Sequence, residues 1–292
     1  MCRLFGMHAG EKPVTATFWL LTAPDSLAEQ SRRMADGFGL GVFDSSGKAV
    51  VDKAPTPAYE DRSYASAART LKDTTFIAHV RYASSGEDTL DNTHPFLQDD
   101  RLLAHNGVVQ DLDVLDDRLR SLEVMHLVKG ETDSERVFAL ITGIARQNGG
   151  ELGEAVTQAV TWVAENLRLY AVNLVITTAT ELWAVRYPDT HPLYVLQESG
   201  DDRHPGKHSS RISVKSDEME QNQSPAVLVA TERMDENPNW RMMDDGEILR
   251  VDRHLNAERF FPLPQHPQHL LTLADLDPHT AASQHPLKEA GT

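Results

Sequence analysis

The stretch DSERVFALITGIARQNGGELGEAVTQAVTWVAENLRLYAVNLVITT, residues 133–178, contains the two clearest helix patterns of the chain and a strand pattern directly after them. Each helix is indicated by apolar residues at helical spacing, which are Val137, Leu140, Ile141 and Ile144 in the first and Leu152, Ala155, Val156, Ala159, Val160 and Val163 in the second. Gly149 and Gly150 separate the two patterns. We therefore expect a pair of helices that covers one face of a sheet.

Strand patterns lie on both sides of this helix pair. The segments that predict strands are 2–9, 36–44, 75–82, 101–105 with 108–109, 170–178, 181–187, 226–231 and 247–253. Residues 14–21 predict a further strand or a buried segment, and Pro24 opens a helix that we expect to reach about Ala35. The connections are too short for repeated crossover helices, so the order predicts a layered α+β domain with mostly antiparallel strands.

Two segments lack these periodic patterns. Residues 197–224 are polar and contain Gly200, Pro205 and Gly206, which predicts a mobile insertion or a long hairpin loop. From Pro264 onward, histidines and prolines lie among small polar residues. That composition predicts a loosely attached C-terminal extension.

Composition excludes several classes of protein. The chain has 292 residues, of which 40% are hydrophobic, so it is long enough to bury a sizeable core. The 28 Lys and Arg against 44 Asp and Glu give a formal net charge of −16, which would repel a nucleic acid or an anionic membrane. One cysteine excludes an intrachain disulfide. No signal-peptide pattern or long apolar run occurs, so we expect a cytoplasmic protein without a nucleic-acid or membrane partner.

Cys2, directly after the initiator methionine, is the first candidate for chemistry. An α-amine has a pKa of about 7.7 to 8.0, so near neutral pH a free amine on Cys2 could take the proton from the thiol of the same residue. The ordinary alternative is a buried core cysteine on a strand, because cysteine is among the most frequently buried residues.

Two further candidates lie at expected strands. Arg81 ends the strand in HVRYASSG, where a guanidinium could bind a carboxylate in a bidentate fork, although an ordinary ion pair is the alternative. Asn106 and Gly107, in LLAHNGVV, match the strongest local signal for a hairpin turn. The same pair could also donate hydrogen bonds to a developing oxyanion.

Asp133 lies in GETDSERVF, where Thr132 and Glu135 match a capping box and place the aspartate in the first helical turn. A carboxylate there either favours the helix dipole or binds the α-ammonium group of a substrate.

Sites for metals and nucleotides are not indicated. The histidines at 79, 94 and 105 lack the helical spacing of a metal site, so we interpret them as hydrogen-bonded or solvent-facing. The glycines of residues 36–44 do not match the GxGxxG spacing that leads into a helix. We expect neither a metal nor another cofactor.

Taken together, the motifs resemble the class II glutamine amidotransferases, specifically the stand-alone branch that includes the γ-glutamyl hydrolase of ergothioneine biosynthesis. The likeness covers about residues 2–255 and is carried by MCRLFG (1–6), HVRYAS (79–84), NTHPF (92–96), AHNG (104–107), ETDSE (131–135), VNLVITTATELWAVRY (172–187) and VATERMDENPNW (229–240). It implies an N-terminal-nucleophile (Ntn) hydrolase fold, a four-layer αββα sandwich of two antiparallel sheets. It also implies a domain of residues 2–255, which leaves 256–292 as the extension.

The resemblance implies a role for each candidate. Cys2 would be the nucleophile and its amine the base, and Asn106 with Gly107 would form the oxyanion hole. Arg81 would bind the substrate carboxylate and Asp133 the α-amino group. Ser84, where the family often has threonine, would add a hydroxyl contact.

Three functions follow from this resemblance. The first is hydrolysis of the γ-amide of glutamine or of a γ-glutamyl amide, with release of glutamate and ammonia or an amine. Synthase members carry a second large domain that receives ammonia, but only about 40 residues follow Arg253 here. The second function is therefore a glutaminase subunit that delivers ammonia to a separate acceptor enzyme. The third is a non-catalytic binding protein on the same fold.

Overall fold

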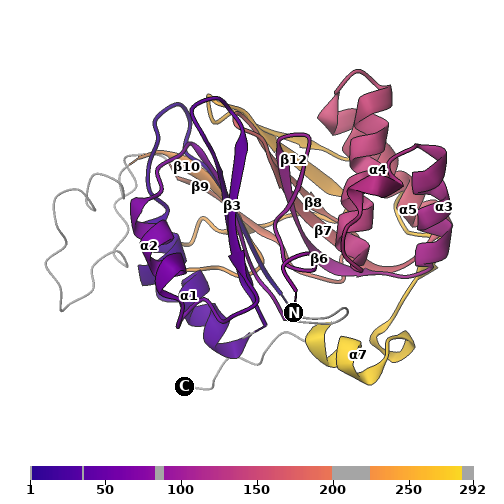
Figure 1. The fold of residues 1–292 in the computed structure, drawn as a ribbon, viewed down its shortest axis with the longest axis horizontal. Coiled ribbons are helices and arrows are strands. Elements are labelled where there is room, and N and C mark those ends of the chain that lie inside the picture. Colours follow the sequence, from indigo (N-terminus) through magenta and orange to yellow (C-terminus); the bar gives the residue numbers. More distant parts are fainter. Residues whose placement is uncertain (1, 35, 83–88, 199–223, 285–292) are drawn as a thin grey trace, which may run out of the picture.

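The structure is a computed structural model that describes residues 2–34, 36–82, 89–198 and 224–284. Two sheets lie face to face, and helices cover both outer faces (Figure 1). The first sheet has the order β11-β9-β10-β1-β4-β2-β3. Its strands are β1 (Arg3–His8), β2 (Phe38–Phe43), β3 (Ala49–Ala54), β4 (Thr75–Val80), β9 (Tyr194–Glu198), β10 (Ala226–Ala230) and β11 (Arg241–Met242).

The second sheet has the order β13-β12-β8-β7-β6-β5, and β14 pairs with β7. Its strands are β5 (Phe96–Gln98), β6 (Arg101–Val109), β7 (Arg168–Thr177), β8 (Leu182–Arg186), β12 (Glu247–Val251), β13 (Ala257–Phe260) and β14 (His269–Leu270). The strand pairs of the described residues are antiparallel, apart from β14 with β7. The predicted αββα sandwich of two antiparallel sheets is confirmed.

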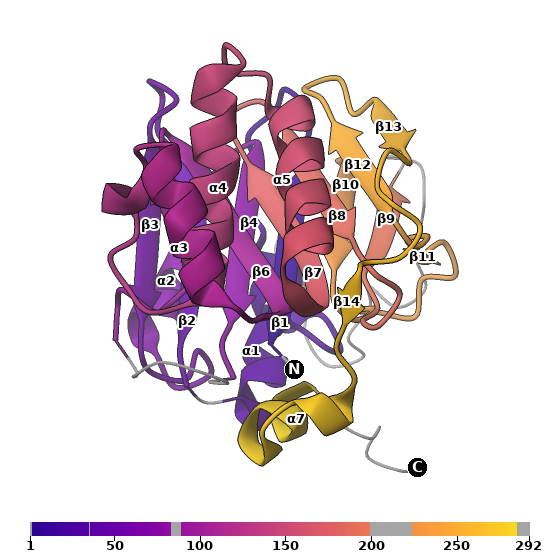
Figure 2. The same ribbon diagram turned by 90° about the vertical axis from the view of Figure 1, so that its right-hand side faces the viewer.

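Different helices cover the two sheets. The first sheet is covered by α1 (Leu27–Gln30) and α2 (Arg62–Thr70), and the second by α3 (Leu112–Ser121), α4 (Asp133–Gln147) and α5 (Leu152–Asn166) (Figures 1 and 2). The short turns are η1 (Phe18–Thr22), η2 (Ser31–Arg33), η3 (Met125–Leu127) and η5 (Leu273–Asp275). The last helix, α7 (Pro278–Gln284), lies at the end of the sandwich where β1 starts (Figure 2).

The helix pair forms where the apolar spacing predicts it. The Thr132 hydroxyl caps α4 by accepting a hydrogen bond from Glu135 N. Glu135 does not close the predicted box on the N-cap residue; instead, its Oε2 atom accepts bonds from Lys129 N at 2.9 Å and Gly130 N at 2.7 Å. Those bonds fix the loop that enters the helix. The apolar stripes of α4 and α5 pack on the second sheet as one buried cluster.

A separate apolar cluster fills the space between the two sheets. It includes Leu4 and Ile77 from the first sheet and Leu102, Val175 and Leu249 from the second. A Cβ atom at Gly6 would lie 2.7 Å from Val175 Cγ1, so glycine lets β1 approach the second sheet closely. This packing fixes the position of β1 relative to the second sheet.

Some local predictions hold only in part, and one lies mostly outside the described residues. Residues 14–21 form the predicted buried segment rather than the alternative strand, with a bridge at Val14 followed by the π-helical turn η1. The helix predicted to reach Ala35 ends at Gln30 and continues as η2. Most of the predicted insertion at 197–224 lies outside the described residues, because these stop at 198 and resume at 224.

The chain after residue 255 is packed over its described part. β13 pairs with β12, β14 pairs with β7, and Leu271 and Leu276 are buried beside Tyr170. The expected domain boundary at 255 stays a prediction, but residues 256–284 add two strands and a helix to the sandwich.

Two neutral histidines are buried against each other, one on β4 of the first sheet and one just before β5. His79 of β4 and His94, just before β5, are 1% and 6% exposed, and their ring centroids are 4.2 Å apart. Burial lowers the pKa of His79 to about 3 and the pKa of His94 well below its ordinary value. Both rings are therefore uncharged near neutral pH. Of the two predicted alternatives, hydrogen-bonded or solvent-facing, the solvent-facing one is wrong for His79 and His94.

We expect Gly39→Ala to destabilise the fold. A Cβ atom on this residue of β2 would lie 1.9 Å from the backbone oxygen of His94, and backbone cannot rotate away as a side chain can. The cost should be about 1–3 kcal/mol in urea unfolding. Val50→Ala is the control, because Val50 is 46% exposed on β3, and it should cost less than about 1 kcal/mol. Equal stability of Gly39→Ala and the parent would contradict the close approach.

Acid should destabilise the protein through its buried histidines. Unfolded histidine titrates near 6.5, whereas folded His79 titrates at about 3, so the unfolded state gains the proton first as the pH falls. One such residue contributes a slope of about 1.4 kcal/mol per pH unit between those values. In urea unfolding at several pH values, His79→Phe should lose stability less steeply than the parent below about pH 6.5. His279→Phe, at an exposed site on α7, should keep the parental slope.

Candidate functional site

The pairing of β1 with β4 places Cys2 beside Arg81 and Tyr82. The strands are antiparallel with Arg3 opposite Val80, so the residue before β1 meets the residues after β4 at one corner of the sheet. The Cys2 thiol donates to Tyr82 O and accepts from Tyr82 N, both at 3.3 Å. Burial raises the pKa of this thiol above its ordinary value, so near neutral pH it carries its proton.

Asn106 and Gly107 lie inside one continuous strand, β6, opposite Asn173 and Val172 of β7. The hairpin alternative for this pair is therefore wrong. The side chain of Asn106 is buried and its Nδ2 atom donates to Cys2 O at 3.2 Å. The amide of Asn106 thus lies against the backbone of the cysteine.

Gly107 is required by crowding rather than by a turn. A Cβ atom at this position would lie 1.9 Å from Ala171 O and 2.7 Å from His105 Nε2. Backbone on the neighbouring strand therefore occupies the space that any side chain would need. The glycine keeps its own backbone accessible to the pocket that it lines.

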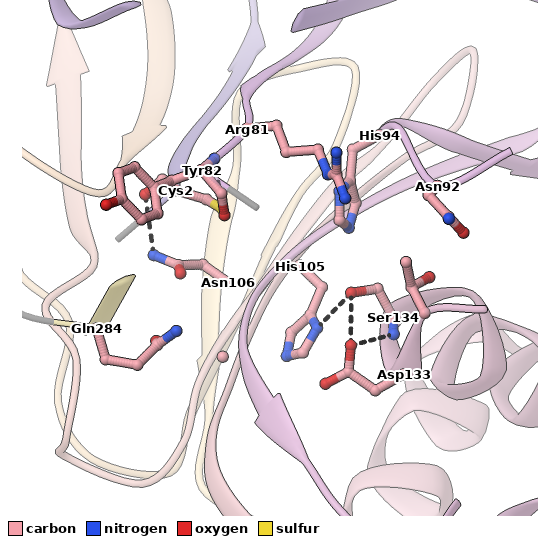
Figure 3. A pocket seen from close by; sticks show the side chains of 12 residues that line it. Cys2, Arg81, Tyr82, Asn92, His94, His105, Asn106, Asp133, Ser134 and Gln284 are labelled. Carbon is pink, nitrogen blue, oxygen red and sulfur yellow. Dashed lines mark hydrogen bonds between the residues drawn. The ribbon is translucent and has the colours of Figure 1, made fainter. Parts of the chain in front are cut away.

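Asp133 is held rigidly at the start of α4. Its Oδ2 atom accepts from Val109 N at 2.8 Å, and its Oδ1 atom accepts from Ser134 N at 2.8 Å. Ser134 Oγ lies 3.2 Å from the same Oδ1 atom and 2.9 Å from His105 Nδ1. These bonds join the helix start to the end of β6 (Figure 3).

One pocket brings together five of the six predicted site residues, which are Cys2, Arg81, Asn106, Gly107 and Asp133. Ser84 lies outside the described residues. The volume open to the centre of a water-sized sphere is about 30 Å³, which is enough for one or two water molecules.

The pocket has other lining residues that we did not predict as site residues: Tyr82, Asn92, His94, His105, Thr132, Ser134 and Gln284. All but Gln284 lie in or beside the quoted motifs, which are the signal that could have found them. Gln284 comes from α7, in a segment with no motif, and its side chain is 4% exposed beside Asn106 (Figure 3).

The histidines of this region do not assemble into a metal-binding group. In the part of the chain that the structure describes, no three His, Cys, Asp or Glu side chains are placed to hold a metal ion. Among the described residues, no helix is both long enough and apolar enough to cross a membrane. Burial lowers the pKa of His105, whose Nε2 atom lies 3.3 Å from Ala171 O. Its contacts with Ser134 and Ala171 make it a hydrogen-bonded residue of the pocket wall.

Relatives of known name share part of this chain. It is 33% identical to the glutamine–fructose-6-phosphate aminotransferase of Pectobacterium atrosepticum over 127 residues. The aligned residues are 40% of this chain and 20% of that protein. A probable glutamine amidotransferase of Saccharomyces cerevisiae is 29% identical over 159 residues, covering 48% of this chain and 44% of its own length. A putative glutamine amidotransferase of Haemophilus influenzae is 26% identical over 215 residues, which are 68% of this chain and 67% of that protein. The chain thus spans less than half of the first two relatives.

Solved structures share the fold. A glutamine aminotransferase class-II domain protein from Silicibacter pomeroyi superposes with a TM-score of 0.60 at 19% identity, over 90% of this chain and 100% of the other. The glutamine phosphoribosylpyrophosphate amidotransferase of Bacillus subtilis gives 0.60 at 19% identity, over 89% of this chain and 49% of that one. The family described as class-II glutamine amidotransferases matches residues 1–269. With the two-sheet sandwich, this match shows that the chain belongs to the class II glutamine amidotransferases.

Proposed function

We propose that this chain hydrolyses the γ-amide of glutamine or of a γ-glutamyl amide through a thioester on Cys2. The observation that carries the proposal is the meeting of the Cys2 thiol with the Asn106 amide, Gly107, Arg81 and Asp133 in one pocket. Membership of a family that acts on amide C–N bonds supports the reaction type.

In the proposed reaction, Arg81 binds the α-carboxylate of the glutamyl group by a charge-assisted fork. Asp133 receives the α-ammonium group, because its carboxylate is already fixed by Val109 and Ser134. The two contacts leave the γ-carbonyl at the thiol of Cys2. An NH₂ group carries two donors, so the bond from Asn106 to Cys2 O leaves one N–H for the oxyanion.

The base of the reaction is the α-amine of Cys2. The thiol carries its proton because burial raises its pKa, so a base is needed. His105 is engaged by Ser134 and the backbone of Ala171, and both oxygens of Asp133 accept backbone N–H groups. An amine on Cys2 itself lies on the same residue as the thiol, and its ordinary pKa of about 7.7–8.0 suits the task.

One proton moves between the thiol, the amine and the leaving nitrogen during the reaction. The amine takes the thiol proton while sulfur attacks the γ-carbonyl carbon, and the oxyanion forms at Asn106 and Gly107. The intermediate collapses to a thioester and the leaving nitrogen takes the proton from the α-ammonium. Water then attacks the thioester and gives one proton to the amine. The C–S bond then breaks, the thiolate takes that proton back from the amine, and the new carboxyl group of glutamate releases the second proton of the water to solvent.

A second function is favoured by the limited coverage of one relative. The aminotransferase of P. atrosepticum aligns with this chain over 20% of its own length, so most of that protein lies outside the alignment. We therefore keep the glutaminase subunit of a two-chain amidotransferase as the alternative. Co-purification of an acceptor enzyme, with glutamine hydrolysis that rises sharply in its presence, would favour this alternative. A chain inactive on every γ-glutamyl amide, with or without a partner, would support the non-catalytic third function.

We expect activity to require removal of Met1, because a peptide-bonded nitrogen on Cys2 cannot act as a base. A form with an uncleavable tag fused before Met1 should fold but release no glutamate from glutamine. Cleavage of a second tag by a protease that leaves Cys2 first should restore full activity. Intact mass identifies each form, and full activity in protein that quantitatively keeps Met1 would exclude the amine as base.

Asn106→Asp should abolish most turnover. The carboxylate offers no donor to the oxyanion and adds negative charge where charge develops, and loss of one such donor costs about 100- to 1000-fold in kcat in other enzymes. The change also removes the bond from Nδ2 to Cys2 O, so thermal unfolding must be measured beside glutamate release. The control is Asn148→Asp, at the half-buried cap residue after α4 and not among the residues that line the pocket, which should keep parental turnover. Parental activity in folded Asn106→Asp would rule out this oxyanion hole.

A further inference from the structure

We infer that Gln284 forms the wall of the pocket on the side of the leaving amine, and that it thereby determines which γ-glutamyl amides this enzyme accepts. The inference rests on the hydrolase function proposed above and concerns its substrate range. The family match ends at residue 269, so the wall comes from a segment outside the matched part of the chain.

Gln284 lies at the correct side of the pocket for this role. The residues proposed to hold the glutamyl group, Arg81 and Asp133, lie on one side of Asn106 (Figure 3). Gln284 lies on the other side, with its amide end turned toward the pocket (Figure 3). The γ-carbonyl carbon is bonded to the glutamyl chain in one direction and to nitrogen in the other. With the carbonyl at Cys2 and Asn106, the nitrogen and its substituent point toward Gln284.

A buried hydrogen bond fixes the side chain of Gln284. Its Oε1 atom lies 2.8 Å from Nε2 of His191, which is 1% exposed. Burial lowers the pKa of His191 to about 4, so the ring is neutral near pH 7 and can donate the proton of Nε2 to the amide oxygen. The ring of His191 packs edge-on against Tyr170 at 5.0 Å. His191 is therefore a positioning residue for Gln284.

The backbone under this histidine is also fixed. Arg186, at the end of β8, donates from Nε to His191 O at 2.8 Å and from Nη1 to Met243 O at 3.1 Å. Asn173 of β7 donates to His191 O at 3.3 Å. Gln284 is thus held by His191, and the backbone of His191 is held in turn by residues of the second sheet.

The helix that carries Gln284 is anchored at its start and along one side. The Oδ1 atom of Asp277 accepts bonds from His279 N and Thr280 N, both at 3.0 Å. Ala281 packs on the cluster of Leu271 and Leu276, which covers Tyr170. The far end of α7 therefore reaches the pocket in one orientation.

Gln284 lines a pocket with little free space, about 30 Å³ in all. Because Gln284 is buried and held by His191, its side chain bounds this space on the side of the leaving nitrogen. A larger amine would overlap the side chain of Gln284 unless this side chain moved. Shortening the residue should therefore favour larger amines relative to ammonia.

The test compares two substrates, glutamine and γ-glutamyl-p-nitroanilide, in the full-length enzyme. The measured quantity is the ratio of kcat/KM for the anilide to kcat/KM for glutamine. Gln284→Ala removes the amide, and we expect this ratio to rise about tenfold or more, a change typical of one or two methylene-sized groups in a pocket. His191→Phe keeps a ring of similar size without the bond to Oε1, so the ratio should rise in the same direction by a smaller factor. His279→Ala, on the exposed side of the same helix, is the matched control and should leave the ratio unchanged.

The outcomes separate this inference from the proposed function. If the parent hydrolyses neither substrate, the hydrolase function itself fails. If the parent hydrolyses glutamine and Gln284→Ala leaves the ratio unchanged or lowers it, the hydrolase function stands and the role of Gln284 is overturned. An equal rise in His279→Ala would also overturn it, because the effect would then come from loosening α7 as a whole. Thermal unfolding of each variant confirms that the compared proteins are folded.

Discussion

The antiparallel pairing of β1 with β4 is the constraint on which the site depends. Because Arg3 lies opposite Val80, Cys2 must meet Arg81 and Tyr82, whatever the rest of the chain does. The close contact between β1 and the second sheet at Gly6 then brings β6 within reach, and Asn106 donates to Cys2 O. A shift of one residue in the pairing of β1 with β4 would turn every side chain of β1 to the opposite face and remove the thiol from the pocket.

Side-chain interactions connect short motifs that lie far apart in the sequence. Arg3 is fully buried and forms an ion pair with Glu232. Leu4 N donates to the hydroxyl of Thr231 at 2.9 Å, so the first motif is tied to the segment after β10. Asn92 accepts from Glu131 N at 2.8 Å and thereby joins the loop before β5 to the start of α4. Each bond satisfies a buried polar group, and its loss would leave a donor or acceptor without its partner.

Features of the fold and the site could be predicted where neighbouring residues in the sequence determine them. Features that depend on contacts between distant parts of the chain could not. Apolar periodicity is local, so α4, α5 and the long strands appear in the sequence within a few residues of their true ends. The Asn106–Gly107 pair was ambiguous because its local signal favours a turn, whereas the neighbouring strand β7 holds it extended. The glycine is needed for its distance to Ala171 O, and such a distance is not visible in one sequence. Gln284 could not be predicted at all, since only the packing of α7 brings it to the pocket that Cys2 lines.

The narrowness of the pocket has a consequence for the proposed reaction. Its lining consists mostly of groups fixed by hydrogen bonds, so it favours a preorganised environment for the oxyanion. Yet a thioester must also be reached by water. Departure of the amine empties the space between Asn106 and Gln284, and this is the space that a water molecule needs for attack on the thioester. The same wall would therefore limit the size of the leaving group and, after it has left, confine the water that completes hydrolysis.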